Sequence, residues 1–230
     1  MGLKIMLSSS NFVIPMKNIL IKNHNFTLHP SGVLFWEEKK MLLIADVHLG
    51  KVAHFRKHGA PVPANAAYKN LEKLTEISNH FQPETICFLG DLFHSKLNEE
   101  WQDFEKWTEY TKAEIILISG NHDIIPQYLY EELGIKVFDE LLLDDFLLTH
   151  HPTEIKGTFN LCGHVHPGVR MKGVGRQYLR FSCFYKTVNS LILPAFGNFT
   201  GKHILKPSEM DEIYAIVEGE VICVSKKIKE

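Results

Sequence analysis

Short apolar runs recur along the chain, and five of them are followed at once by a motif of His, Asp or Asn. Each motif alone is weak evidence, because a lone histidine is usually a structural residue. Five in succession, each after its own run, are hard to explain as coincidence. If the runs are strands of one sheet, the motifs converge on the edge where loops usually host chemistry. The motifs are Asp46-Val47-His48, Gly90-Asp91-Leu92-Phe93-His94, Gly120-Asn121-His122-Asp123, His150-His151-Pro152 and Gly163-His164-Val165-His166.

The remaining pattern predicts a mixture of strands and helices. Apolar residues close to the helical period, with a proline after the end, predict a helix over Ala66–Phe81, and an apolar face opposite acids predicts another over Glu99–Thr111. The first half alternates strand and helix, whereas the second half is mostly strands. This favours two packed sheets flanked by helices over a single doubly wound sheet. The predicted strands are Asn18–Ile21, Val33–Trp36, Met41–Ala45, Thr85–Leu89, Glu114–Ser119, Phe146–Thr149, Phe159–Cys162, Tyr178–Phe184, Leu191–Ala195, Tyr214–Val217 and Val221–Val224.

Length and composition indicate one globular domain. The 230 residues suffice for a sizeable core, and we expect a domain over residues 16–230 after an extension with little structure over residues 1–15. No apolar stretch approaches the roughly 18–20 residues of a membrane span, and no cleavage site follows the first apolar residues. We therefore expect a cytoplasmic protein. Its four cysteines, which lack the spacing of a zinc site, are expected to be reduced and buried: Cys87, Cys162, Cys183 and Cys223.

The side chains of the five motifs are typical ligands of divalent metals. Imidazole and carboxylate groups without thiolates suit Mn, Fe, Zn or related ions. In an Asp-x-His or His-x-His motif, the alternation of an extended chain sends both side chains to the same side, so both can reach one centre. Two metals roughly 3.5–4 Å apart need a bridging group, and a carboxylate has the two oxygens for it. Asp91 is the candidate bridge.

In this order and spacing, the motifs resemble those of the calcineurin-like metallophosphoesterase superfamily. They read ADVHLG, GDLFH, GNHD, THHP and GHVH. The resemblance implies a four-layer α/β/β/α sandwich with two mixed sheets flanked by helices, and two divalent ions, Mn before Fe, Zn, Ni or Mg. In the fourth motif His150 is preferred to His151, because it ends the strand. The implied ligands are Asp46, His48, Asp91 and His166 for the first metal, and Asp91, Asn121, His150 and His164 for the second.

The same resemblance implies a mechanism. His122 would face the leaving-group oxygen as general acid, oriented by Asp123. Two divalent ions, two aspartates and a bridging hydroxide leave the centre at about +1, whereas an Asp in place of Asn121 would neutralise it. The metals would lower the pKa of bound water from about 15.7 toward about 7, and the hydroxide would attack phosphorus in line while protonated His122 helps to expel the alkoxide. This predicts a metal-dependent phosphoesterase.

Two other segments narrow the resemblance. Leu42–Pro63 and Leu193–Gly201, the latter reading LPAFGNFTG, resemble the bacterial ligase-associated DNA damage response phosphoesterases, the PdeM-type group. The resemblance extends over nearly the whole chain, from about Met16 to Val224. It implies a role near DNA repair, phosphodiester bonds of DNA or another nucleic acid as substrate, and DNA ligase or helicase repair proteins as partners.

Basic residues are concentrated in the C-terminal half. Between Ile155 and Ser208 the sequence has no Asp or Glu. Arg170 and Arg176, with aromatic residues nearby, are suited to tracking a nucleic-acid backbone. The alternative is a β-hairpin with solvated charges and a buried aromatic face. Three further candidates for substrate binding have equally plain alternatives, as loop residues or as an ordinary packed histidine: Lys51, Arg56 and His94.

Three functions remain open from the sequence. The leading one is a nucleic-acid phosphodiesterase or nuclease that uses Mn²⁺. The second is a phosphoesterase acting on nucleotides or other small phosphorylated metabolites, because 230 residues leave little room for a separate DNA-capping domain. The third is a non-catalytic scaffold, which the loss of a ligand or of His122 would signal, but every expected position is filled.

Overall fold

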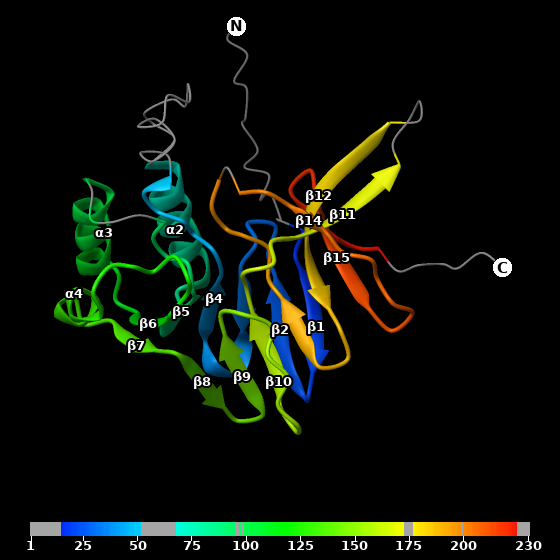
Figure 1. Cartoon of the computed structure of the whole chain (residues 1–230), viewed down its shortest axis with the longest axis horizontal. Helices are drawn as coiled ribbons and strands as arrows, with labels where there is room; N and C mark the ends of the chain where they lie inside the picture. The colour runs from blue at the N-terminus through cyan, green and yellow to red at the C-terminus, as the bar shows by residue number, and fades with distance from the viewer. Residues whose placement is uncertain are drawn as a thin grey trace, which may run out of the picture.

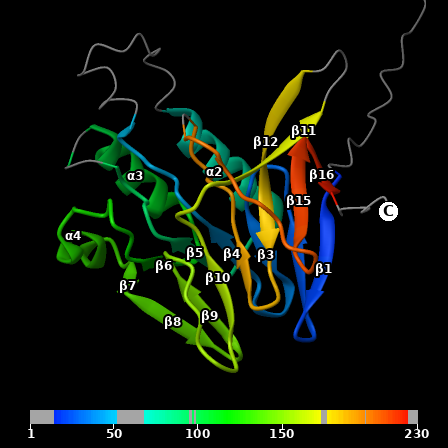
Figure 2. The same ribbon diagram turned by 45° about the vertical axis from the view of Figure 1, so that its right-hand side comes forward.

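Two mixed β-sheets lie face to face in the computed structural model, which describes residues 15–51, 68–94, 97, 99–172, 177–198 and 200–224 (Figures 1 and 2). In the first sheet, successive strands pair antiparallel from the first to the fourth and parallel from the fourth to the seventh. Across the sheet these strands are β1 (Lys17–Ile21), β2 (His24–Leu28), β3 (Leu34–Trp36), β4 (Met41–Ile44), β5 (Thr85–Leu89), β6 (Glu114–Ile118) and β7 (Lys136–Phe138).

The second sheet contains the C-terminal half of the chain. Three of its strands, β9, β10 and β13, run parallel, while β11 and β12 form an antiparallel hairpin that projects from the body of the molecule (Figure 1). In order, the strands are β14 (His203–Ile204), β11 (Pro167–Lys172), β12 (Tyr178–Lys186), β13 (Ser190–Ile192), β10 (Phe159–Cys162), β9 (Phe146–Thr149) and β8 (Glu140–Leu143), with β15 (Glu212–Val217) paired to β12 and β16 (Glu220–Cys223) paired to β15.

Three apolar clusters hold these layers together. The first lies between the sheets and contains Trp36, Phe146 and Phe184, all fully buried. Burying a large apolar side chain contributes roughly 1.5–3 kcal/mol, so this cluster is a main source of stability. The second lies between the first sheet and the helices, and the third lies on the other face of the second sheet. The helices within the described ranges are α2 (Tyr68–Phe81), α3 (Glu99–Tyr110) and α4 (Gln127–Glu132), with a short 3₁₀ turn, η1 (Glu37–Lys39).

The predicted arrangement of two mixed sheets with flanking helices is confirmed. The helices expected over Ala66–Phe81 and Glu99–Thr111 appear as α2 and α3, although residues 66–67 lie outside the described part. In the described residues these helices and α4 all pack on the first sheet, as Figure 1 shows. Strands β2, β7, β8, β11 and β14 and helix α4 were missed, because each is short or mixes polar and apolar residues without a clear period.

The structure tests only some of the other expectations drawn from composition. The extension over residues 1–15 and the single domain over residues 16–230 stay predictions, since residues 1–14 and 225–230 lie outside the described part. Three of the cysteines are buried, but Cys223 is exposed at the end of β16, contrary to expectation, because that position faces outward on an edge strand. None of the helices that the structure describes has the length and apolar character to cross a membrane.

Candidate metal centre

The first two motifs lie side by side because their strands are parallel neighbours. β4 pairs with β5, and beyond the strand ends the pairing continues through a bridge between Leu49 and Phe93. The amide of Asp46 donates to the Gly90 carbonyl at 3.2 Å, and the amide of His48 donates to the Asp91 carbonyl at 2.9 Å. The backbone therefore fixes the two loops before any side chain contributes.

Five of the predicted ligands have left-handed backbone conformations. Their φ values are 54° at Asp46, 52° at His48, 52° at Asp91, 66° at His164 and 50° at His166. For residues other than glycine this conformation costs roughly 1–3 kcal/mol and tends to occur at functional sites. The prediction that alternation along an extended chain aims each Asp-x-His or His-x-His pair is therefore wrong, because the left-handed turns aim these side chains.

Four side chains form a first group of donor atoms. The Nε2 atom of His166 lies 3.2 Å from Asp46 Oδ1 and 3.4 Å from His48 Nε2. His48 Nε2 is also 3.9 Å from Asp91 Oδ2. Asp46, His48 and Asp91 are buried and His166 is half-buried, so the group is open to solvent on one side.

A second group adjoins the first through the same aspartate. His150 Nε2 lies 3.0 Å from Asn121 Oδ1, 3.1 Å from His164 Nδ1 and 3.4 Å from Asp91 Oδ1. Asp91 thus turns Oδ2 toward the first group and Oδ1 toward the second. The two oxygens of one carboxylate face separate clusters of nitrogen and oxygen donors, which is the arrangement a bridging ligand requires.

The hydrogen bonds of these residues fit cation binding. His150 Nδ1 lies 2.9 Å from the Leu89 carbonyl, to which only a ring N–H can donate, so Nε2 turns a lone pair toward the oxygens around it. The Asp46 carboxylate accepts from the His164 amide through Oδ2, while Oδ1 is buried without a hydrogen-bond donor. Burial, with smaller contributions from nearby cations, lowers the pKa of His48 to about 2, so its ring is neutral, the form that binds metals. The lone pairs of His150 Nε2 and Asp46 Oδ1 are therefore available to cations.

The fourth motif places two histidines differently. His150 is buried, and Gly90 makes room for it, since a Cβ at Gly90 would lie 2.2 Å from His150 Nδ1. His151 is exposed, and its ring packs 4.0 Å from that of His164, centroid to centroid. Both can belong to a metal-binding cluster of three histidines with His164. Only His150 lies against both Asp91 and Asn121, which supports the preference for it.

His122 lies beside the first group, in a cluster of rings. Its centroid is 5.7 Å from that of His48 and 4.6 Å from that of His94. Its backbone amide donates to Asp91 Oδ1 at 2.9 Å. The ring is half-buried, so it can reach a group bound above the two clusters.

Asp123 does not take the expected position beside the His122 ring. Its two oxygens accept from backbone amides instead, Oδ1 from Phe93 at 3.1 Å and Oδ2 from Gly120 at 2.9 Å. Burial raises the pKa of Asp123 to about 6, against the effect of these amides. The carboxylate therefore ties the third motif to the second, and any effect on His122 passes through the loop.

Only some of the predicted substrate-binding residues lie near the two groups of donor atoms. Lys51 is half-buried near Asp46 and Asp91, whose charges oppose the lowering of its pKa by burial. His94 stacks beside His122. Arg170 lies apart on the projecting hairpin, with its guanidinium carbon 3.7 Å from the centroid of the Tyr178 ring. Arg56 and Arg176 lie outside the described residues.

Three buried polar residues that the sequence did not single out hold the loops in place. The amide of Asn70 on α2 donates to the Val47 carbonyl at 3.2 Å. Glu100 on α3 accepts from the Gly50 amide at 2.7 Å. Asn160 on β10 donates to Leu147 and Thr149 and accepts from the Thr153 amide, which fixes the turn after His150. The sequence signal available was a polar residue inside an apolar run, which Asn160 shows.

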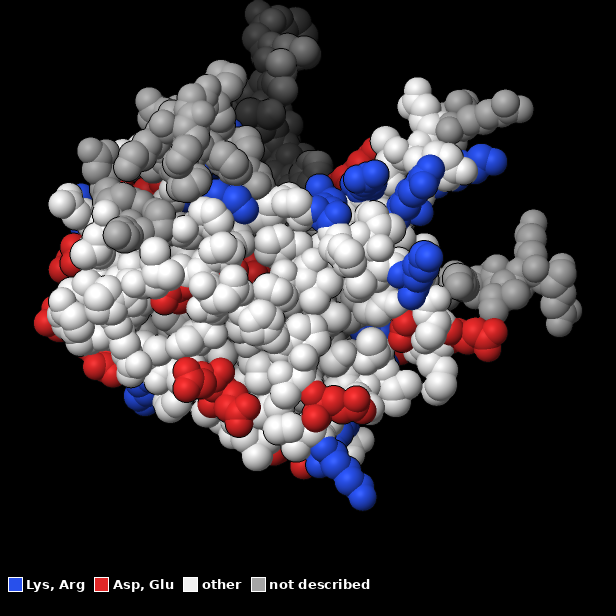
Figure 3. Space-filling model, viewed as in Figure 1, with Lys and Arg blue, Asp and Glu red and all other residues white. Residues whose placement is uncertain are grey.

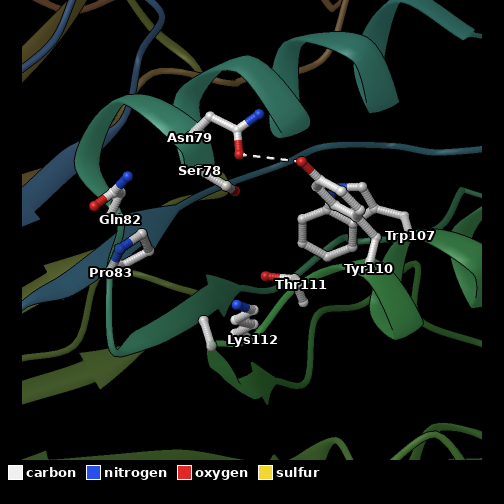
Figure 4. Close-up of a pocket in the computed structure, with 9 residues that line it drawn as sticks. Ser78, Asn79, Gln82, Pro83, Trp107, Tyr110, Thr111 and Lys112 are labelled. Atoms are coloured by element: carbon white, nitrogen blue, oxygen red, sulfur yellow. Dashed lines mark hydrogen bonds between the residues drawn. The ribbon is translucent and has the colours of Figure 1, made fainter.

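A wider cavity lies elsewhere, between the C-terminal ends of α2 and α3 (Figure 4). Its volume is about 570 Å³, and Trp107 and Tyr110 form one wall opposite Ser78 and Asn79. The Tyr110 hydroxyl donates to Asn79 Oδ1 at 3.5 Å. None of the histidines or aspartates of the five motifs is among the described residues that line this cavity.

The chain is similar to a known protein family and to proteins of known structure. The model of the calcineurin-like phosphoesterase family matches residues 39–187, more than half of the chain. The structure of the nuclease MPE from Pseudomonas putida is similar over 91% of this chain and 100% of that chain, with 28% identity and a TM-score of 0.75. The phosphoesterase Yfce from E. coli matches 80% of this chain and 98% of its own at 15% identity, with a TM-score of 0.39. No curated protein matches.

The matched residues 39–187 include all five motifs, and the family is one of hydrolases acting on phosphoester bonds at dinuclear metal sites. The chain belongs to the calcineurin-like phosphoesterase family.

Proposed function

We propose that this protein is a dinuclear metal-dependent phosphodiesterase that hydrolyses nucleic acid. One ion is held by Asp46, His48, Asp91 and His166, and the other by Asp91, Asn121, His150 and His164. The observation that supports this most is the Asp91 carboxylate, whose oxygens face two separate donor groups, 3.9 Å from His48 Nε2 and 3.4 Å from His150 Nε2. Mn²⁺ is the proposed ion, since mixed oxygen and imidazole ligands accept it.

The chemistry is divided between the ions and the chain. Bound divalent ions polarise a phosphoryl oxygen and make water acidic enough to yield a nucleophile at neutral pH. His122 is the proposed general acid, because it is half-buried beside the first group and can place a proton on the leaving oxygen. His94 packs against the ring of His122 and limits its orientations. Lys51 is the proposed contact for a non-bridging phosphate oxygen.

Two observations support nucleic acid as the substrate. The similar Pseudomonas putida protein is a nuclease. In addition, Lys and Arg side chains gather over the β11–β12 hairpin in Figure 3, whereas acidic side chains gather along the opposite lower edge. Arg170 and Arg180 face each other across the hairpin, and neither forms an ion pair with an acid in the described residues. Like charges placed opposite each other destabilise a strand pair, so a polyanion there would relieve the repulsion. A link to DNA repair and its ligase or helicase partners is part of the same proposal.

The test compares hydrolysis of bis-p-nitrophenyl phosphate, a diester, with that of p-nitrophenyl phosphate, a monoester, in Mn²⁺. We expect a preference for the diester and a fall of about 100-fold or more in kcat for His122→Ala, with both ions retained. His80→Ala, at an exposed histidine on α2 outside the five motifs, is the matched control and should keep most of the activity. A preference for the monoester would redirect the search to small phosphorylated metabolites. No hydrolysis with both ions bound would contradict the enzyme assignment.

A further inference from the structure

The LPAFGNFTG segment, which supplies none of the proposed metal ligands, lines a separate cavity of about 240 Å³. Five other parts of the chain complete the lining: the turn between β2 and β3, helix α2, strands β12 and β15, and Lys202, which follows the segment directly. The volume is below the roughly 300–1,000 Å³ of sites for drug-sized ligands, so a small group fits best.

The polar lining of this cavity is suited to an anion. It has two cationic side chains, Lys73 and Lys202, and the hydroxyls of Ser31, Ser182 and Thr200, while no Asp or Glu is among the described lining residues. The Ser31 hydroxyl already contacts His29 Nδ1 at 2.8 Å, and the Thr200 hydroxyl donates to the Gly197 carbonyl at 3.2 Å. The two ammonium groups and the Ser182 hydroxyl are therefore the donors available to a tetrahedral oxyanion. A carboxylate ligand from the protein would compete for these donors, and none lines the cavity.

Lys73 enters the cavity without an anionic partner. Its Nζ donates to the Phe196 carbonyl at 2.9 Å and lies 3.8 Å from the centroid of the Phe196 ring. No described acid forms an ion pair with it, and burial lowers the pKa of Lys73 to about 8. Removing an ammonium from water without a counter-charge is unfavourable, whereas a bound anion would compensate it. The neighbouring His29 adds no negative charge, and the proximity of Lys73 helps to lower the pKa of that ring.

Lys202 and Ser182 are side by side at the opposite wall. Gly168 on β11 pairs with Ser182 on β12, and a Cβ on Gly168 would lie 2.9 Å from Lys202 Cβ. The glycine thus lets the Lys202 stem cross the hairpin next to Ser182. Within the described residues, neither the Lys202 ammonium nor the Ser182 hydroxyl has a hydrogen-bond or ion-pair partner, so both are available to a ligand.

The cavity is joined to the metal centre by a short piece of backbone. The Phe196 amide donates to the Ala45 carbonyl at 2.9 Å, and the Gly197 amide donates to the Asp46 carbonyl at 3.0 Å. Phe196 and Gly197 therefore contact the loop of the first proposed ligand on one side and line the cavity on the other.

We propose that this cavity is a second anion site that binds a phosphate group other than the one being hydrolysed, through Lys73, Lys202 and Ser182. The inference rests on the proposed function in one respect: the phosphate would belong to the same polynucleotide substrate. Free inorganic phosphate presents the same chemistry, so the experiment has one arm for each source.

The first arm measures the thermal unfolding of the metal-loaded protein with increasing inorganic phosphate. Lys202→Ala should lose about half or more of the phosphate-dependent rise in Tm. Lys206→Ala, at an exposed lysine shortly after Lys202 in the chain but outside the cavity, should retain it. Ser182→Ala should show a smaller loss in the same direction. Because Lys202 is exposed, its removal should leave the fold intact, and Lys73→Arg serves as the conservative variant at the half-buried position. Equal rises in wild type and Lys202→Ala would overturn the proposal.

The second arm compares KM for bis-p-nitrophenyl phosphate, with one phosphate, and for thymidine 5′-phosphate 3′-(p-nitrophenyl phosphate), with two. Lys202→Ala should increase the KM ratio of the two-phosphate to the one-phosphate substrate about ten-fold, as one lost charge-assisted hydrogen bond predicts. Lys206→Ala should not change this ratio. A lost Tm effect with an unchanged KM ratio would assign the site to free phosphate. If wild type hydrolyses neither substrate, the proposed function fails, and the Tm arm still decides whether the cavity binds phosphate.

Discussion

The two ends of the parallel strands in the first sheet differ in the side chains and the backbone conformations that gather there. At the carboxyl ends of β4 and β5, the buried side chains of Asp46, His48 and Asp91 meet on loops with left-handed backbone. At the amino ends, beside the starts of β5 and β6, the cavity between α2 and α3 has about 570 Å³ but no such cluster among its lining residues. If cavity volume alone indicated the functional site, the site would be at the amino ends. The converging donor atoms, which strained backbone holds in place, indicate the carboxyl ends instead.

Left-handed backbone occurs at both ends, but with different causes. At the amino end Gln82 has a φ of 45°, and its amide donates to the Ser78 carbonyl directly after α2. That is the ordinary way in which a helix terminates. Asp46, Asp91 and His166 follow strands and terminate no helix, so their strain requires another explanation, and ligand geometry provides one. The surroundings of a strained residue therefore decide whether it indicates function.

The largest expected effect is at Asp91. Asp91→Asn should lower the rate of bis-p-nitrophenyl phosphate hydrolysis by at least about 1,000-fold, equivalent to about 4 kcal/mol of barrier, because an amide bridges two cations poorly. Bound metal, measured by mass spectrometry, should fall below two ions per chain. If Asp91→Asn retained two ions and the wild-type rate, the donor atoms at the carboxyl ends would no longer distinguish that end of the sheet as the functional one.

The second prediction concerns the contact between the LPAFGNFTG segment and the first metal loop. A Cβ at Gly197 would lie 2.2 Å from the Val47 carbonyl oxygen, a backbone atom that cannot move without displacing Asp46. Gly197→Ala should therefore reduce the free energy of unfolding by about 1–3 kcal/mol, measured by denaturant titration, and weaken metal binding. Gly201→Ala is the control, since nothing lies within 4 Å of its Cβ position. Equal stability of the two variants would show that the loop adapts.

The third prediction separates a structural histidine from the proposed ligands. His29 is buried, its Nδ1 accepts from the Ser31 amide at 3.0 Å, and burial lowers its pKa to about 4. The unfolded chain takes up this proton below about pH 6.5 and the folded chain only below about pH 4. Stability should thus fall by roughly 2 kcal/mol as pH falls between these values. Denaturant titrations at pH 7.5 and 5.0 should show a smaller fall for His29→Asn, which keeps an acceptor. An equal fall would assign the acid sensitivity to other groups.

The smallest effect is expected at the wide cavity. Tyr110 is 62% exposed, and its hydrogen bond to Asn79 is long. Tyr110→Ala should change the free energy of unfolding by no more than about 0.5 kcal/mol and leave phosphodiester hydrolysis within two-fold of wild type. Loss of activity in this variant would mean that the amino ends of the strands take part in function.

Much of the fold and most of the proposed site could be predicted from the sequence. Strands such as Thr85–Leu89 and Phe159–Cys162 were located to the residue because they are mainly apolar runs followed by ligand motifs. Strand β11 was missed, because Pro167–Lys172 begins with Pro-Gly and leaves only four residues in which apolar and basic side chains alternate. The Asp123 contact was placed wrongly, since a sequence does not show that two backbone amides nearby need an acceptor.

The sequence by itself determined which side chains meet, because strand runs followed by ligand motifs can bury their apolar faces only by gathering the strand ends at one edge. The tertiary structure decided how those side chains are aimed. Left-handed turns at Asp46, His48 and His166, and the division of the Asp91 oxygens between two groups, depend on long-range backbone bonds that local sequence does not encode. It also decided that Lys73 and Lys202, 129 positions apart, line one cavity, because packing of the two sheets brings α2 to the segment after β13.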